Sequence, residues 1–276
     1  MEKGLEQKLR ALKDIIRQLG SVCIAFSGGV DSTFLTKVSK DLLGDNVIAV
    51  TAVSPTYPKR EVEEAIAIAK EIKVRHLIIQ SGELNIPDFS KNTPRRCYYC
   101  KSDLFERLKD LSRKYGMRYV LDGSNYDDLG DYRPGREAAK EKGVRSPLCE
   151  AGLRKEEIRL LSMALGLRTW NKPSFACLSS RIPYHERITV KKLEQIEKAE
   201  EALRDLGFSQ IRVRHHGKMA RIEILPEEFP VILESVKRAA IVKKLKSLGF
   251  VYITLDLLGY RTGAMNEALT SANRIT

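Results

Sequence analysis

Short apolar runs alternate with stretches of helical spacing from the N-terminus to about residue 182. The apolar runs have the length of buried strands and lie at 21–26, 46–53, 75–79 and 118–122. Apolar residues recur every three or four positions in the stretches 33–43, 58–73, 101–115 and 153–165. Strands that alternate with helices predict an α/β fold, a doubly wound parallel sheet with ligands bound at the carboxyl ends of its strands.

The pattern changes after residue 182. Helical spacing over 190–206 is followed by SQIRVRHHGKMARIEIL, two alternating stretches around a His-Gly-Lys turn, then by a long helical stretch and the run VYITLDLLGY. This order predicts a small antiparallel sheet with helices on one side. We therefore expect an α/β domain over 1–182, a smaller α+β module over 183–262 and a tail over 263–276.

The segment FSGGVDST joins the first apolar run to the first helical stretch. At a strand-to-helix turn, the first N–H groups of the helix have no partner inside it and carry the positive end of the dipole, so the turn can bind phosphate. The glycines let a ligand approach the backbone closely. No lysine follows them, which excludes a Walker-type loop, and G-x-G-x-x-G is also absent. The alternative is an ordinary strand-to-helix turn.

Composition narrows the choice of partners. The 48 lysines and arginines exceed the 36 aspartates and glutamates, and the net charge of +12 favours anionic partners such as nucleotides, phosphorylated small molecules or RNA. No apolar run approaches the roughly 18 residues that span a bilayer, and the first 19 residues predict an amphipathic helix rather than a signal peptide. We expect a cytoplasmic protein without a membrane partner, in which the five cysteines include metal ligands or reactive thiols.

Three cysteines stand in suggestive positions. Cys97 and Cys100 form C-x-x-C at the start of a helix, where the dipole favours thiolates, and Cys177 lies in NKPSFACLSSR. Three thiols are too few for a four-thiolate zinc site and suit a [4Fe–4S] cluster with one open iron. A redox dithiol, zinc with a fourth ligand, or plain buried cysteines remain alternatives. Cys23 and Cys149 are expected to be structural.

The loop S-G-G-x-D-S resembles the pyrophosphate-binding loop of the PP-loop, or N-type ATP pyrophosphatase, superfamily. Over nearly its full length the chain also resembles one family of that superfamily, the LarE family of ATP-dependent sulfur transferases. The resemblance is carried by FSGGVDST, CYYCK, VLDGSNYDDLGDYRPG, WNKPSFACLSSRIPY and LGFVYITLDLLGYRTGAMN. These enzymes install sulfur on the pyridinium-dicarboxylate mononucleotide precursor of the nickel-pincer nucleotide cofactor.

The resemblance implies an enzyme that cleaves ATP to AMP and pyrophosphate with Mg²⁺ nearby. The residues expected to bind ATP are Ser27, Gly28, Gly29, Asp31, Ser32, Val53, Ser54, Gly123 and Arg133. Those expected to act in catalysis are Asp31, Cys177 and Arg181. Members that sacrifice a cysteine lack the C-x-x-C, so Cys97, Cys100 and Cys177 are expected to hold a cluster whose open iron binds the transferred sulfide. The family also implies a homo-hexamer that works with other cofactor-biosynthesis enzymes.

Two groups of charged residues are candidates for the substrate and the metal. Arg212 and Arg214 alternate with apolar residues, so both lie on one face of a strand and can grip the substrate phosphate. Two solvated strand arginines are the alternative. The acidic residues of the DGSNYDDLGD stretch either hold Mg²⁺ or cap a loop: Asp122, Asp127, Asp128 and Asp131.

Three other functions compete with sulfur transfer to a small molecule. A tRNA thiolase can combine the same loop with a cluster, but the chain has no zinc-knuckle cysteine pairs or aromatic-rich basic stretch, which argues against nucleic acid as a partner. An amide-forming ligase such as an NAD synthetase would not need three thiols. A non-enzymatic nucleotide-sensing module would bind ATP without releasing pyrophosphate.

Overall fold

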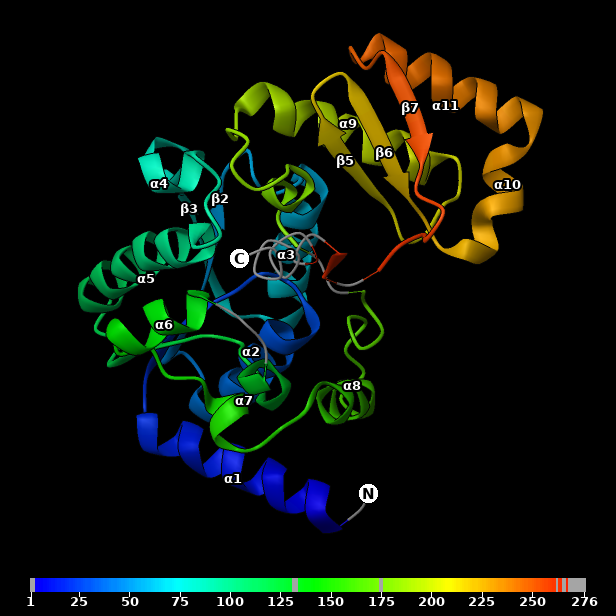
Figure 1. Cartoon of the computed structure of the whole chain (residues 1–276). Coiled ribbons are helices and arrows are strands. Elements are labelled where there is room, and N and C mark those ends of the chain that lie inside the picture. The colour runs from blue at the N-terminus through cyan, green and yellow to red at the C-terminus, as the bar shows by residue number, and fades with distance from the viewer. Residues whose placement is uncertain (1–2, 131–133, 174–175, 262, 265–266, 268–276) are drawn as a thin grey trace. The chain divides into compact units, whose positions relative to one another are not determined.

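The structure is a computed structural model that describes residues 3–130, 134–173, 176–261, 263–264 and 267 (Figure 1). It divides into two compact units, residues 1–89 with 95–175 and residues 90–94 with 176–276. The sequence placed a boundary after residue 182 and did not associate 90–94 with the second unit. Hydrogen bonds explain this association: the Asn92 side chain donates to the carbonyls of Ile182 and Pro183, and Ile188 N–H donates to Ser90 O.

A four-stranded parallel sheet forms the centre of the first unit. Its strands are β1 (Val22–Ala25), β2 (Val47–Val53), β3 (Arg75–Gln80) and β4 (Tyr119–Leu121), in the order β3-β2-β1-β4. The predicted strands and their parallel arrangement are confirmed. Because β2 and β4 lie on opposite sides of β1, the strand order reverses there, and ligands of open α/β sheets bind at such a point.

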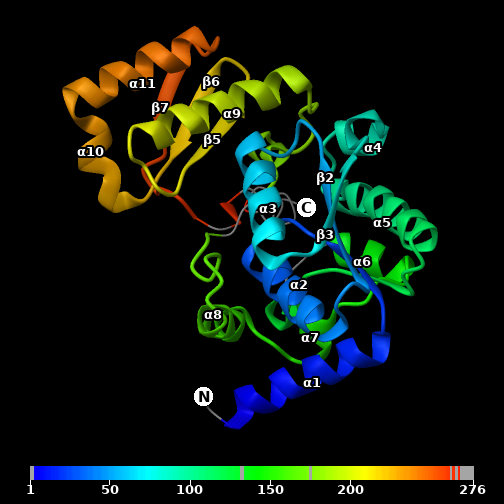
Figure 2. The ribbon, with the colours of Figure 1, turned by 180° about the vertical axis from the view of Figure 1, so that it is seen from behind.

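Alternation along the central strands buries both faces of this sheet. Val22 and Ile24 of β1 belong to one apolar core with residues of α1, α2, α3 and α8, whereas Cys23 belongs to the opposite core with α5 and α6. Figures 1 and 2 show α5 and α6 on the far side of the sheet from α2 and α3. The fold is therefore the predicted doubly wound α/β fold. The helices of this part of the chain are α1 (Lys3–Leu19), α2 (Val30–Leu43), α3 (Lys59–Ile72), α4 (Pro87–Ser90), α5 (Arg96–Lys114), α6 (Pro134–Glu141), α7 (Pro147–Glu150) and α8 (Lys155–Ala164).

A three-stranded mixed sheet forms the second unit. Strand β5 (Arg212–His216) pairs antiparallel with β6 (Met219–Glu223), and β7 (Tyr252–Leu255) pairs parallel with β6. The prediction of an antiparallel sheet is therefore wrong for β7, because the chain crosses over through helices between β6 and β7 and returns in the same direction. Helices α9 (Val190–Asp205) and α11 (Ser235–Ser247) share one apolar core with the sheet and lie on one face of it in both ribbon views.

The long helix predicted before β7 is two helices. Helix α10 (Phe229–Leu233) ends before Glu234, whose extended backbone (φ −53°, ψ 133°) separates it from α11. Periodicity alone did not reveal this break, since apolar spacing continues across it. Among the residues the structure describes, no helix is long and apolar enough to cross a membrane.

Candidate active site

The glycine turn between β1 and α2 forms a compact loop at the carboxyl end of the sheet. The hydroxyl of Ser32 accepts the backbone N–H of Ser27 at 3.3 Å, lies 3.1 Å from the Ser27 hydroxyl and donates to Gly29 O at 3.3 Å. Gly29 precedes α2 without a side-chain cap on the helix. The positive end of α2 therefore has no side-chain cap in the described part of the chain, an arrangement that suits an anion.

Two glycines allow close packing around this loop. Gly28 has φ +68°, and a Cβ there would lie 2.9 Å from the Cα of Ala65 on α3. At the end of β4, a Cβ on Gly123 would lie 3.1 Å from the backbone nitrogen of Ser32. The expected ATP residues Gly28, Gly123 and Ser32 therefore meet at the point where the strand order reverses, and a side chain at either glycine would close the space.

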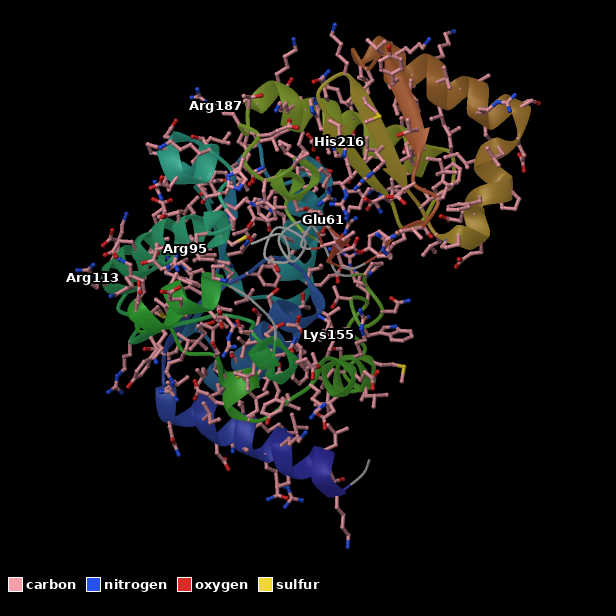
Figure 3. All side chains as sticks on the ribbon, in the orientation of Figure 1. Glu61, Arg95, Arg113, Lys155, Arg187 and His216 are labelled. Carbon is pink, nitrogen blue, oxygen red and sulfur yellow. The ribbon has the colours of Figure 1, made fainter. Side chains whose placement is uncertain are left out.

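Asp31 sits at the start of α2 with its two carboxylate oxygens in different environments. Oδ2 accepts a 2.5 Å ion-paired hydrogen bond from Lys155 Nζ at the beginning of α8 (Figure 3). Oδ1 is buried and has no hydrogen-bond partner in the described part of the chain. A buried carboxylate oxygen without a partner, beside the uncapped start of a helix, suits Mg²⁺, which prefers oxygen ligands.

A second lysine supports the loop from outside. Lys172 Nζ donates to Gly28 O at 3.3 Å and lies 2.8 Å from carboxylate oxygens of both Glu61 and Glu64 on α3. It ties the loop to α3, the same helix against which Gly28 packs. The sequence patterns did not indicate Lys155 or Lys172 as neighbours of the loop. Lys172 lies within the segment WNKPSFACLSSRIPY, but neither lysine has a sequence spacing that relates it to the loop.

The ends of β2 and β3 converge on a carboxylate that the sequence patterns also did not indicate. Glu83 is completely buried, and its oxygens accept hydrogen bonds from the hydroxyls of Ser54, Thr56 and Ser81. Three hydroxyl donors compensate the burial of this polar group. Glu83 thereby fixes the segment that begins with Val53 and Ser54, two residues expected to bind ATP.

The acidic stretch after β4 orders its own loop. Asp122 accepts from Ser124 N–H and from the hydroxyls of Ser124 and Ser146, Asp127 accepts from Lys155 N–H, and Asp128 accepts from Asn125 N–H. These bonds match the loop-capping alternative for those three residues. Asp131 and Arg133, the latter expected at the ATP site, lie outside the described residues.

The cysteines differ in exposure. Cys97 and Cys100 lie in the first two turns of α5, Cys97 exposed and Cys100 partly exposed, and Cys177 of the second unit is partly exposed. Cys23 is buried in the core, and burial raises the pKa of its thiol to about 12, which makes it inert as a nucleophile. Burial also raises the pKa of Cys149. In the described part of the chain no three His, Cys, Asp or Glu side chains are grouped to hold a metal ion.

In the second unit, a buried arginine organises the segment around Cys177. Arg181 has no exposed surface; it pairs with Glu200 of α9 at 2.8 Å and donates to the carbonyls of Ala176 and Cys177. Burial alone would raise the pKa of Glu200, but the charge and hydrogen bonds of Arg181 lower it overall. Arg181 therefore holds the two peptide groups that flank Cys177.

Arg212 and Arg214 share one face of β5, as the alternation predicted. Arg214 is 4% exposed, pairs with Glu223 through two hydrogen bonds and donates to Ser180 O. Arg212 is 9% exposed and lies over the ring of Tyr260; burial, together with the positive charge of Arg181, lowers its pKa to about 10. The alternative of two solvated strand arginines is therefore wrong.

The parallel sheet, the uncapped glycine loop and its aspartate together define a PP-loop nucleotide-binding protein. Comparison with known proteins agrees: residues 5–93 match the NAD synthase family. The chain is 42% identical to the pyridinium-3,5-bisthiocarboxylic acid mononucleotide synthase of Lactiplantibacillus plantarum, over 96% of this chain and 95% of that protein. It is 47% identical to an uncharacterised protein of Synechocystis over 96% of this chain and 99% of that protein, and 31% identical to one of Methanocaldococcus jannaschii over 93% and 98%.

The chain belongs to the LarE family of ATP-dependent sulfur transferases. Its resemblance to this family, and its character as an ATP-dependent sulfur-transferring enzyme, are confirmed.

Proposed function

We propose that this protein uses ATP to activate a carboxylate of a pyridinium-dicarboxylate mononucleotide and then replaces the activating group with sulfur, in nickel-pincer cofactor biosynthesis. The proposal is carried by the uncapped S-G-G-x-D-S loop at the reversal point of the sheet, with the buried Oδ1 of Asp31 beside it, which has no hydrogen-bond partner in the described part of the chain. The full-length similarity to the Lactiplantibacillus synthase supports the substrate class.

The chemistry requires activation because a carboxylate is a poor acyl donor. A carboxylate oxygen attacks the α-phosphorus of ATP, the bond from this phosphorus to the bridging oxygen breaks, and pyrophosphate leaves with the electron pair. A sulfide then attacks the activated carbonyl carbon, and AMP leaves with the former carboxylate oxygen. The product is a thiocarboxylate. Pyrophosphate therefore has to be held where its charge develops, which is the role of the loop residues and the start of α2.

Different residues of the chain are proposed to bind pyrophosphate, Mg²⁺ and the nucleotide. Ser27, Gly28, Gly29 and Ser32 surround the pyrophosphate, and Asp31 would hold Mg²⁺, which neutralises phosphate charge when bound. Val53, Gly123 and Ser54, whose hydroxyl donates to Glu83, are proposed to line the nucleotide site. Arg181 is a positioning residue for Cys177, since its buried guanidinium contacts the backbone there.

Cys97, Cys100 and Cys177 carry the thiols that a [4Fe–4S] cluster needs as ligands, but in the described part of the chain they are not grouped as a metal site. Cys97 and Cys100 stand at a helix start that favours thiolates, and all three thiols have exposed surface, as Cys149 also has, whereas Cys23 is buried. When bound, such a cluster would supply an open iron site for the transferred sulfide. The conversion of Cys177 to dehydroalanine by loss of its own sulfur is the alternative source.

Arg212 and Arg214 are proposed to bind the phosphate of the substrate. Glu223 accepts two hydrogen bonds from Arg214 and orients its guanidinium. Replacing both arginines with alanine should weaken binding of the mononucleotide far more than binding of ATP, because ATP uses the loop of the other unit. Calorimetric titration of each ligand checks this. Equal losses for the two ligands would contradict the assignment.

We further propose that the protein acts in the cytoplasm as a homo-oligomer, a hexamer by its resemblance to the family, alongside other enzymes of cofactor biosynthesis. Light scattering coupled to gel filtration measures the oligomer directly.

The proposed ATP chemistry is tested by its products. Incubation with ATP, Mg²⁺ and the substrate should yield AMP and pyrophosphate on ion-exchange chromatography, and Asp31→Ala should abolish both while leaving the circular dichroism spectrum unchanged. ADP and phosphate as products would refute the proposal.

A further inference from the structure

The phosphate loop contains no lysine, yet the fold brings one to it from far along the chain. Lys155 follows Asp31 by 124 positions, and its Nζ lies 2.5 Å from Asp31 Oδ2. The backbone N–H of Lys155 donates to Asp127 at 2.8 Å, so the start of α8 is fixed beside the start of α2. Both partners keep some exposed surface, 27% for the Lys155 side chain and 22% for Asp31. The ammonium group is thus placed at the loop and accessible to a ligand.

The two lysines near the loop differ in how far their charge is already compensated. Lys172 is 12% exposed and has carboxylates of both Glu61 and Glu64 at 2.8 Å. Lys155 is paired with one carboxylate, that of Asp31, among the ion pairs of the described residues. An anion that enters the loop would meet the negative charge of Asp31, and the ammonium of Lys155, 2.5 Å from that carboxylate, offsets this charge. The ammonium of Lys172 already has two carboxylate partners, one more than that of Lys155.

We infer that Lys155 is a catalytic residue that binds the leaving pyrophosphate. A lysine from α8 would then bind phosphate oxygens, as a Walker lysine does from a position within its own loop. An ammonium group has three N–H donors, so Lys155 can keep Asp31 as one partner while it donates to phosphate oxygens. As the bond to the α-phosphorus breaks, negative charge accumulates on pyrophosphate and strengthens these hydrogen bonds. The inference rests on the proposed ATP chemistry.

Titration with inorganic pyrophosphate and with AMP tests this role separately from turnover. Lys155→Met should raise the dissociation constant of pyrophosphate roughly 10- to 100-fold, as expected for the loss of charge-assisted hydrogen bonds, and leave that of AMP almost unchanged. Lys142→Met is the matched control, because it removes a lysine ion-paired with Glu106 at 2.6 Å elsewhere in the same unit. It should change neither constant.

The competing role is a structural tether between α2 and α8. In that case Lys155→Met would lower the melting temperature and leave pyrophosphate affinity unchanged, or weaken pyrophosphate and AMP equally through a disordered loop. Either result would overturn the inference. If the methionine variant does not fold, Lys155→Gln, which can still hydrogen-bond Asp31 without a charge, carries the same comparison. Failure of the wild type to form AMP would refute the proposed function instead, whatever the pyrophosphate titration shows.

Discussion

Among single residues, the glycines of the phosphate loop matter for the space that they leave open. Gly28 leaves room for α3, and Gly123 leaves room for the backbone of Ser32. This space lets the loop pack against α3 and lets the segment after β4 pack against the start of α2, while the first N–H groups of α2 stay uncapped.

Gly28→Ala should therefore damage the site more than an ordinary glycine substitution. The positive φ costs about 1–2 kcal/mol for an alanine, and the new Cβ would also press on Ala65. Gly116→Ala is the control, because Gly116 has φ +69° and a Cβ there would meet no atom of the described residues within 4 Å. Calorimetry should show ATP binding weakened at least tenfold in the first variant and unchanged in the second. Similar ATP affinities in the two variants would show that the close approach is unimportant.

The sequence revealed the loop residues but not the side chains that contact and fix the site. S-G-G-x-D-S is contiguous, so its strand–turn–helix context could be recognised from the flanking pattern. Lys155 and Glu83 act through tertiary contacts with residues 124 and up to 29 positions away, and no local pattern distinguishes them from solvated charges. The predicted face shared by Arg212 and Arg214 was correct because strand alternation is local, whereas their burial depends on Glu223 and Tyr260.

Among the helices and strands, periodicity predicted every strand of both described sheets. It missed α6, which begins with Pro-Gly and is short, as well as the four-residue helices α4 and α7, and it merged α10 with α11. The parallel pairing of β7 could not be read from its own sequence, since strand direction within a sheet depends on the path of the connecting helices.

The link between α9 and the Cys177 segment gives a prediction on stability and pH. Arg181→Met leaves Glu200 buried and unpaired, which should destabilise the second unit by about 3–5 kcal/mol near pH 7. The wild-type pair lowers the pKa of Glu200, so its contribution is present above the ordinary glutamate range and is lost as pH falls through the lowered pKa. In Arg181→Met, burial without the arginine should raise the pKa of Glu200, so that Glu200 is protonated and uncharged at about pH 4. The destabilisation relative to the wild type should therefore be smaller at about pH 4 than near pH 7.

Hydrogen exchange of α9 and β5 in denaturant measures this change within the second unit. Arg168→Met is the control, because the pair of Arg168 with Glu71 is exposed on both sides and should contribute less than about 1 kcal/mol. If Arg181→Met lowers the free energy of unfolding only slightly, or equally at both pH values, the buried pair does not stabilise this segment.

Across the whole molecule, the proposed chemistry draws on both units. The phosphate loop, Cys97 and Cys100 belong to the first, and Cys177, Arg212 and Arg214 to the second. Sulfur transfer as proposed therefore needs contributions from residues that are distant in sequence and lie in separate cores.

Single substitution of Cys97, Cys100 or Cys177 by alanine should abolish iron–sulfur absorption and sulfur transfer together while ATP affinity is retained. Anaerobic reconstitution followed by iron and sulfide analysis checks this. Cys23→Ala and Cys149→Ala should keep both properties, because neither thiol is proposed as a ligand. Wild-type protein without iron–sulfur absorption, in which mass spectrometry finds Cys177 converted to dehydroalanine after turnover, would instead support sacrifice of that cysteine.

The proposed function depends above all on the substrate carboxylate attacking ATP and losing that oxygen to AMP. Substrate labelled with heavy oxygen in its carboxylates, incubated with enzyme, ATP and a sulfide source, allows a direct measurement by mass spectrometry of the AMP formed. We expect one labelled oxygen in each AMP and one sulfur in place of it in the product. Unlabelled AMP, or ADP in its place, would show that the carboxylate is not activated by adenylation.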